Sequence, residues 1–544
     1  MKKFSTIIHI AIIIVGIAFT LLSNFYEAMW FDESYSVAIS AHSFGEIWSI
    51  GGHDVHPVLY YWILHILRLI FGNNIIVFKL FSAICISILG IIGFTHVRKD
   101  FGSKVGMLFS FFVFFLPLNI IYAGQIRMYP LAMLFVALTA IYAYRIYKNS
   151  KIECNKLKEM NTSNANTTKE VNDAKQENSL NKNSMTDSKN NNSKNKGLKN
   201  WILFTIFSLA GAYTHYYALA ASVVINAVFM IYLIIQAKQE KKFTTNLKIF
   251  ILCGIIQILA YIPWLVYLLL QAKQVSQGYW IEMRFPDTFI EMFTFQFTGN
   301  LVEQKYVPDA VSGIYGVLVC AIIVYLFIKN RAKEGESKEK NLAPKIAIVI
   351  YLLVIIAVCV ASLIVGRSIL YARYLLCITG LFIFFISFIL GKYGNKIIIS
   401  VVCGITLIIS SYINYNLIQI NHDESNMPPI EYLEENIQEG DIIVYGNEGQ
   451  AFVVSAHFPD VQQYFWDQAY WNVDEAYKAY GPNMQIIHDL DILEDYHGRI
   501  WVINATNYAI ANSIEEEFGA NVVEKREYIT VYEDYKYTIA LVEK

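Results

Sequence analysis

Acidic and histidine side chains gather in one short segment after the first apolar stretch of this chain. Asp32 and Glu33 open the segment, and His53, Asp54 and His56 follow before the next apolar stretch. A carboxylate can take a proton from a hydroxyl group, and histidines and acids can bind phosphates, sugar hydroxyls or a metal ion. Such charges at a membrane edge are costly unless they bind or react with something, so this segment is the first candidate site.

Arginine and tyrosine residues stand out in two further polar segments. Arg127 and Tyr129 lie in one, and Arg373 and Tyr374 lie in the other. The planar guanidinium donates two hydrogen bonds to phosphate and stays charged, so both arginines are candidate phosphate ligands, with the tyrosines as nearby donors. The alternative is that these residues, together with Arg367, anchor the chain at the level of the lipid headgroups, where arginine and tyrosine are common.

The composition is that of a membrane protein. The chain has 544 residues, of which 55% are hydrophobic and 16% charged, and its mean hydropathy is +0.40. A soluble protein has about 25% charged residues. The lipid bilayer is therefore an expected partner of this chain, and a nucleic acid is not.

Apolar stretches long enough to cross a membrane as helices recur along the chain, and they predict about eleven transmembrane helices. They run near Ile7 to Leu22, Ile75 to Val97, Val105 to Tyr122, Pro130 to Tyr147, Trp201 to His215, Tyr217 to Ile235, Ile249 to Leu270, Val311 to Ile328, Ile346 to Val365, Leu375 to Leu390 and Ile397 to Ile418.

Lysines and arginines concentrate in the loops on one side of these spans, which marks that side as cytoplasmic. The N-terminus then lies in the cytoplasm, and an odd number of spans places the C-terminus outside. Pro57 to Phe71 is apolar but only about 15 residues long, so we expect it to lie at the outer surface. All the polar segments, including Thr214 to Tyr217 with His215, then lie outside the cytoplasm.

The composition divides the chain into four regions. Residues 1–147 form an N-terminal transmembrane module with a catalytic first outer loop at 23–74, and 201–420 form a second transmembrane module. Residues 148–200 are rich in Asn, Lys and Ser, which predicts a disordered cytoplasmic linker. Residues 421–544 alternate short apolar runs with helix-like stretches, which predicts a small extracytoplasmic α/β domain.

This arrangement resembles the GT-C membrane glycosyltransferases that use polyprenyl-phosphate sugars, the group that contains protein O-mannosyltransferases and aminoarabinose transferases. The resemblance rests on Asp32-Glu33 after the first span, on His56-Pro57-Val58-Leu59-Tyr60-Tyr61, and on Arg127-Met128-Tyr129 after the third span. The family usually has a second proline where this chain has Val58. The resemblance implies a polytopic α-helical membrane protein of GT-C architecture.

The resemblance also implies roles for these residues. Asp32 is the expected base for the acceptor proton, and Glu33 is expected to orient the acceptor or Asp32. The alternative is that both acids only cap a helix that begins near Ser34, where acids meet the positive end of its dipole. His53, Asp54, His56 and His215 are expected to bind substrate phosphate or sugar hydroxyls.

The expected function is an inverting glycosyltransferase that moves a monosaccharide from a polyprenyl-phosphate donor, with undecaprenyl as the expected carrier, to an extracytoplasmic acceptor. No cofactor is expected, and a divalent metal at His53, Asp54 and His56, with His215, is the open alternative. A glycoside hydrolase needs two carboxylates facing each other across about 5 to 9.5 Å, which adjacent residues seldom do. A polytopic transporter or flippase would place its ionisable groups mid-membrane rather than at the outer rim.

Overall fold

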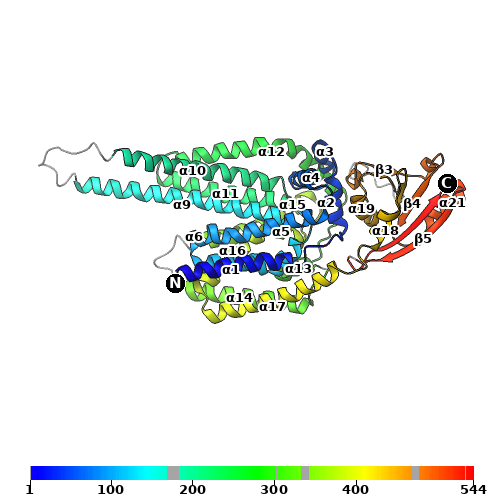
Figure 1. Cartoon of the computed structure of the whole chain (residues 1–544). Coiled ribbons are helices and arrows are strands. Elements are labelled where there is room, and N and C mark those ends of the chain that lie inside the picture. The colour runs from blue at the N-terminus through cyan, green and yellow to red at the C-terminus, as the bar shows by residue number, and fades with distance from the viewer. Residues whose placement is uncertain (1, 168–182, 302–303, 332–341, 468–476, 533) are drawn as a thin grey trace.

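The computed structural model describes residues 2–167, 183–301, 304–331, 342–467, 477–532 and 534–544. Long helices lie side by side in one bundle, and a domain with a β-sheet caps the end of the bundle opposite the N-terminus (Figure 1). The long helices are α1 (Lys2–Leu21), α5 (Ile75–Ile92), α9 (Tyr129–Thr167), α10 (Asn183–Ala212), α11 (Tyr216–Gln239), α12 (Thr245–Gln277), α14 (Asp309–Arg331), α15 (Leu342–Val365), α16 (Leu376–Tyr393) and α17 (Lys396–Asn421). The shorter α7 (Ser103–Phe115) and α8 (Pro117–Ala123) complete the bundle.

The polytopic membrane fold expected from the sequence is confirmed, with a smaller number of spans than expected. Within the described residues, nine helices are long and apolar enough to cross a membrane, or ten if the bent pair α7 and α8 counts as one span. The pair bends by 55° because Pro117 begins a new helix after the extended Leu116. The eleventh predicted crossing, Trp201 to His215, falls on the C-terminal part of α10, which packs along α9 and α11.

The predicted linker at 148–200 is helical at both ends in the structure. The backbone of α9 continues to Thr167 and that of α10 begins at Asn183, while residues 168–182 lie outside the described residues. No glycine or proline occurs between Pro130 and Gly197. Nothing in the sequence therefore ends α9 soon after it leaves the apolar region.

Short helices occupy the end of the bundle that carries the C-terminal domain. They are α2 (Phe31–Ile39), α3 (Phe44–His53), α4 (Leu59–Phe71) and α13 (Asp287–Thr298), with a 3-10 turn at Ala372–Leu375. At the opposite end, a π-helical turn (Gly93–Val97) and α6 (Arg98–Phe101) extend α5. The apolar α4 has 13 residues, which is too short for a span, as expected for a helix at the membrane surface. Ser43 begins α3 with a capping box to Glu46.

The C-terminal domain is the α/β unit that the sequence predicts. Its six strands are ordered β3-β2-β1-β4-β6-β5, parallel from β3 to β4 and antiparallel at β6 and β5. The strands are β1 (Ile442–Tyr445), β2 (Gln462–Trp466), β3 (Met484–Ile487), β4 (Arg499–Asn504), β5 (Asn521–Ile529) and β6 (Lys536–Glu543), and the helices are α18 (Pro428–Asn436), α19 (Glu448–His457) and α21 (Ala509–Phe518), with 3-10 turns at Lys478–Tyr480 and Asp491–Leu493. All four residues of β1 are buried, as expected of a central parallel strand.

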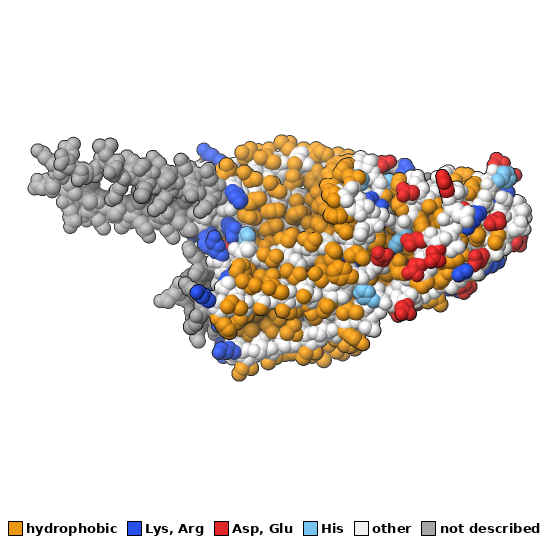
Figure 2. Space-filling view, viewed as in Figure 1, with side chains coloured by type: hydrophobic (Ala, Val, Ile, Leu, Met, Phe, Trp, Pro, Cys, Tyr) orange, Lys and Arg blue, Asp and Glu red, His pale blue; other side chains and the backbone are white. Residues whose placement is uncertain are grey.

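The C-terminal domain packs directly on α2, so the two units meet at the first loop of the membrane part. The ring of Phe452 on α19 lies 4.7 Å from the ring of Phe31 and 5.7 Å from that of Tyr35, measured between centroids. In Figure 2, most of the visible Asp and Glu side chains lie on this domain, an apolar band follows, and Lys and Arg side chains lie at the far end. This distribution is typical of a protein whose basic end faces the cytoplasm.

We expect the C-terminal domain and the first loop to lie on the same, extracytoplasmic side of the membrane. Alkaline phosphatase fused after Lys544 should be active, because it folds only outside the cytoplasm, and a fluorescent protein fused there should be dark. A cysteine at the exposed Ser43 should react with an impermeant thiol reagent in intact cells. A cytoplasmic Ser43 would rule out the outward orientation altogether.

Candidate active site

Asp32 lies where three loops of the membrane part meet. Arg373, in the 3-10 turn before α16, donates a hydrogen bond from Nη1 to Asp32 Oδ2 over 2.7 Å. Arg127, in the loop between α8 and α9, has its Nη2 3.5 Å from the same oxygen. Its Nη1 donates to the Asp32 main-chain carbonyl over 2.7 Å and to Ser36 Oγ over 3.3 Å. The acid and the two arginines singled out in the sequence therefore form one cluster.

Asp32 and Arg127 differ in how far their side chains are exposed. The Asp32 side chain is 24% exposed, whereas that of Arg127 is 3% exposed. Burial alone lowers the pKa of Arg127, but the charge of Asp32 and the neighbouring Tyr129 raise it above its usual value. Arg127 is therefore a buried permanent cation, and its burial does not fit an anchor among lipid headgroups.

Aromatic rings surround the Arg373 guanidinium. Its Cζ lies 5.1 Å from the centre of the Trp30 ring and 4.7 Å from that of Tyr371, and Nη2 donates to the Tyr371 hydroxyl over 2.8 Å. Cation–π contacts of this kind orient a guanidinium and stabilise its charge. Arg367, in the same segment, is exposed and stands apart from this group. The structure thus places Arg373 beside Asp32 and leaves Arg367 at the surface.

Asp54 connects the segment that carries His56 to Tyr35 on α2. His56 Nδ1 lies 2.9 Å from Asp54 Oδ2, and the Tyr35 hydroxyl donates to the same oxygen over 2.5 Å. Burial alone raises the pKa of Asp54, but the charge of His56 and the hydrogen bonds from His56 and Tyr35 outweigh it, so the pKa is lowered. Tyr35 lies one helical turn beyond Asp32, so this contact also ties the end of α3 to the helix that carries Asp32.

His53 stands apart from this pair. It is exposed, and its Nδ1 lies 2.8 Å from the main-chain oxygen of Ser49 one turn earlier in α3. Within the described residues, no three His, Cys, Asp or Glu side chains are placed so that they could hold a metal ion. The ligand set considered from the sequence, with His53, Asp54 and His56, is therefore not assembled.

His215, Tyr129 and Tyr374 form an aromatic group beside the arginines. The ring of His215 lies 5.4 Å from that of Tyr129 and 5.0 Å from that of Tyr374. His215 begins α11, where its Nδ1 accepts a hydrogen bond from the main-chain nitrogen of Tyr217 over 3.0 Å. Burial, together with the positive charges of His56 and Arg127, lowers the pKa of His215 well below its usual value. These surroundings therefore favour the neutral form of the His215 ring.

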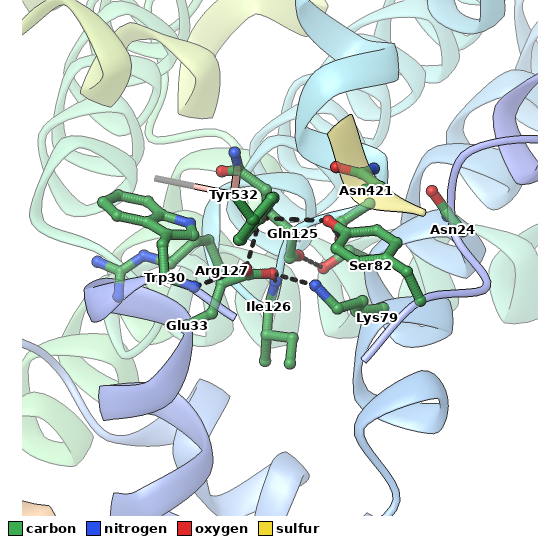
Figure 3. A network of polar contacts seen from close by, with 12 residues as sticks. Asn24, Trp30, Glu33, Lys79, Ser82, Gln125, Ile126, Arg127, Asn421 and Tyr532 are labelled. Atoms are coloured by element: carbon green, nitrogen blue, oxygen red, sulfur yellow. Dashed lines mark hydrogen bonds and ion pairs between the residues drawn. The ribbon is translucent and has the colours of Figure 1, made fainter. Parts of the chain in front are cut away.

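Glu33 turns away from Asp32 into the protein interior, where Figure 3 shows its contacts. Its Oε1 accepts hydrogen bonds from Lys79 Nζ over 2.9 Å and from the main-chain nitrogen of Ile126 over 2.8 Å. Its Oε2 accepts from the Tyr532 hydroxyl over 2.9 Å and lies 3.4 Å from the main-chain nitrogen of Trp30. The last contact caps α2, which begins at Phe31 rather than near Ser34. Glu33 is fully buried, a position that suits orientation of Asp32 better than contact with an acceptor.

Lys79 belongs to this site although it lies outside the sequence motifs. It is fully buried, and its ammonium lies 3.6 Å from the centre of the Tyr26 ring. It lies within the apolar stretch from Ile75 to Val97 that predicts a transmembrane helix. A lysine within such a stretch is itself a signal, because an ionisable side chain in a membrane segment needs a partner.

No protein-family model matches this chain, and no curated protein matches its sequence. Two solved structures match over nearly the whole length, both of ArnT from Cupriavidus metallidurans. The structure bound to undecaprenyl phosphate has a TM-score of 0.56 and 10% identity, and the apo structure has a TM-score of 0.56 and 11% identity. Each match covers 99% of this chain and 98% of the other.

The chain has the fold of ArnT. The match extends from the first helix through the C-terminal sheet, so the ArnT-like architecture includes both units described above. The polytopic helical architecture and the C-terminal α/β domain expected from the sequence are confirmed, and both are arranged as in ArnT. At 10% identity the match concerns the fold, and the chemistry must be argued from the side chains of this chain.

Proposed function

We propose that this protein is an inverting glycosyltransferase that moves a monosaccharide from a polyprenyl phosphate to a hydroxyl group of an extracytoplasmic acceptor. The observation that carries the proposal is the partly exposed Asp32 carboxylate flanked by Arg127 and Arg373. This is the combination of a base and two phosphate-binding cations that the reaction needs. The ArnT fold supports it, because ArnT was solved with undecaprenyl phosphate.

In the proposed reaction, the acceptor oxygen attacks the anomeric carbon from the side opposite the phosphate. The new carbon–oxygen bond forms as the bond from the anomeric carbon to the phosphate oxygen breaks, and the phosphate leaves with the bonding electrons. Asp32 takes the proton of the acceptor hydroxyl. Arg127 and Arg373 stabilise the negative charge that grows on the phosphate.

The hydrogen bond between Arg373 and Asp32 gives donor binding a second effect. In the structure, Asp32 Oδ2 already accepts a hydrogen bond from the Arg373 guanidinium, which competes with an acceptor hydroxyl for that oxygen. A phosphate oxygen beside Arg373 would share that guanidinium and weaken its hold on Asp32. Donor binding would thereby prepare the base for the acceptor proton.

The proposed function is tested by mass spectrometry of lipid-linked sugars and surface glycans from cells with and without the gene, and by incubation of the purified protein with the lipid that accumulates. Transfer of the sugar to an acceptor, with release of polyprenyl phosphate, is the expected result. Movement of the lipid-linked sugar across a vesicle membrane without covalent transfer would indicate a transporter instead.

Replacement of Arg373 by alanine should weaken donor binding and turnover together. Hydrogen bonds to a charged group contribute about 1.5 to 3 kcal/mol, or roughly 10- to 150-fold in affinity. Titration of the purified protein with undecaprenyl phosphate measures the binding effect, and Arg373→Lys should be intermediate because lysine keeps the charge and loses the fork. The exposed Arg367→Ala is the matched control. Equal affinities for Arg373→Ala and Arg367→Ala would remove Arg373 from the phosphate site.

A further inference from the structure

The turn between β5 and β6 reaches from the C-terminal domain to the first turn of α2. The Tyr532 hydroxyl donates a hydrogen bond to Glu33 Oε2 over 2.9 Å. The main-chain nitrogen of Phe31 donates to the Tyr535 hydroxyl over 3.2 Å. Phe31 and Glu33 are the two neighbours of Asp32. Two tyrosines of one turn therefore hold the residues on either side of the proposed base.

The Glu33 carboxylate extends this contact to the arginine loop. Its other oxygen accepts hydrogen bonds from Lys79 on α5 and from the main-chain nitrogen of Ile126, the residue before Arg127. One buried carboxylate thus joins α2, α5, the loop between α8 and α9, and the C-terminal domain. A change in the position of Tyr532 acts on both Asp32 and Arg127 through this group.

Tyr532 is itself fixed within the protein. Its main-chain nitrogen donates to Asn426 Oδ1 over 2.7 Å, and its hydroxyl oxygen lies 3.3 Å from that of Tyr26. The Tyr26 hydroxyl donates in turn to the main-chain oxygen of Gly124 over 3.1 Å. Tyr532 is buried, with 8% of its surface exposed. A side chain held at both ends can transmit the position of its domain rather than follow α2 passively.

We propose that Tyr532 and Tyr535 are positioning residues, through which the C-terminal domain fixes Asp32 relative to Arg127 and Arg373. This inference rests on the proposed function, because it assigns the tyrosines a role in the reaction of Asp32. Without the Tyr532 hydroxyl, the remaining contact of Glu33 Oε2 among the described residues is the Trp30 nitrogen at 3.4 Å. The first turn of α2 is then held less firmly, although Lys79 and Ile126 still bind Glu33 Oε1. A displacement of about 1 Å can cost about 100-fold in rate. The C-terminal domain is on this basis a structural part of the catalytic centre.

Tyr532→Phe and Tyr535→Phe test the inference, since each removes one hydroxyl and keeps the ring. We expect kcat to fall by about 10- to 100-fold in Tyr532→Phe, with a much smaller change in the KM for the donor. Tyr496→Phe is the matched control, because the Tyr496 hydroxyl donates to the main-chain oxygen of Gly440 within the C-terminal domain, over 2.6 Å. It should leave kcat unchanged. An equal loss of kcat in Tyr496→Phe and Tyr532→Phe would show a general effect on the stability of the domain and would overturn the assignment.

Hydrogen–deuterium exchange of the intact protein tests the contact without reference to activity. Peptides covering Phe31 to Ile39 should exchange about fivefold faster in Tyr532→Phe and Tyr535→Phe than in wild type, as expected for the loss of one hydrogen bond. Peptides covering β4 should be unchanged. Unchanged exchange of α2 would refute the positioning role even if transfer is observed. If the wild-type protein transfers no sugar, the proposed function fails, and exchange still decides whether the tyrosines hold α2.

Discussion

Asp32→Asn should abolish sugar transfer while the protein stays folded and inserted. Asparagine keeps the size of the side chain and can still accept a hydrogen bond from Arg373, but it cannot take up the acceptor proton. Loss of a general base typically costs about 100- to 10,000-fold in rate. The measurement is single-turnover transfer from a polyprenyl-phosphate sugar by the purified variant, with undecaprenyl phosphate titration to show that the donor site is intact.

The effect of Asp32→Asn can be compared with that of the same substitution at Asp54. Asp54 is also an ionised carboxylate near the same helix, but Tyr35 and His56 already bind it. Asp54→Asn should therefore reduce transfer less than Asp32→Asn does. Wild-type turnover in Asp32→Asn would show that Asp32 is not the base. A greater loss of transfer in Asp54→Asn than in Asp32→Asn would indicate that Asp54 is the base instead.

Lys79→Met should destabilise the protein by about 3 to 5 kcal/mol, the usual effect of removing one partner from a buried ion pair. Both side chains of the pair with Glu33 are 0% exposed, and their closest atoms are 2.9 Å apart. Methionine fills most of the space that lysine occupies, so the main loss is the charge that balances Glu33. Thermal unfolding in detergent, followed by intrinsic fluorescence, measures the effect.

Two variants distinguish the ion pair from a general effect of losing a lysine. Lys329→Met changes an exposed lysine at the end of α14 and should leave the unfolding temperature within error of wild type. The double variant Glu33→Gln with Lys79→Met should be more stable than Lys79→Met alone, because no uncompensated charge remains. A double variant that is less stable than Lys79→Met would mean that the hydrogen bonds of the Glu33 carboxylate to Ile126 and Tyr532 outweigh its uncompensated charge.

The sequence predicts which residues form the Asp32 cluster because all of them lie at the same end of the helix bundle. Asp32, Arg127 and Arg373 each lie where a loop meets a helix end at the same end of the bundle, so correct helix boundaries suffice to bring them together. His53 lies apart from His56 because α3 ends between them, which the three-residue spacing in the sequence does not reveal. The contact of Tyr35 with Asp54 was equally invisible, since it depends on which way α2 rotates about its axis.

Other parts of the site lie beyond what local patterns can indicate. Lys79 carried a usable signal, a charge within an apolar stretch, and only its partner had to come from the structure. The sequence around Tyr532 gives no such signal, because tyrosine is common at the surface of soluble domains. The smaller number of candidate spans also has local reasons, since Pro117 divides one predicted crossing into two helices at an angle, and the predicted crossing from Trp201 to His215 is not among the candidate spans of the described residues.

The hydrogen bond between Tyr532 and Glu33 also sets an order of assembly. It joins residues that are 499 positions apart, and contacts of such separation form late, after the intervening chain has folded. The bundle helices must be inserted and the sheet of the C-terminal domain completed before this bond can close. On the proposed function, a chain in which this bond has not yet closed would hold Asp32 less firmly and would transfer sugar more slowly.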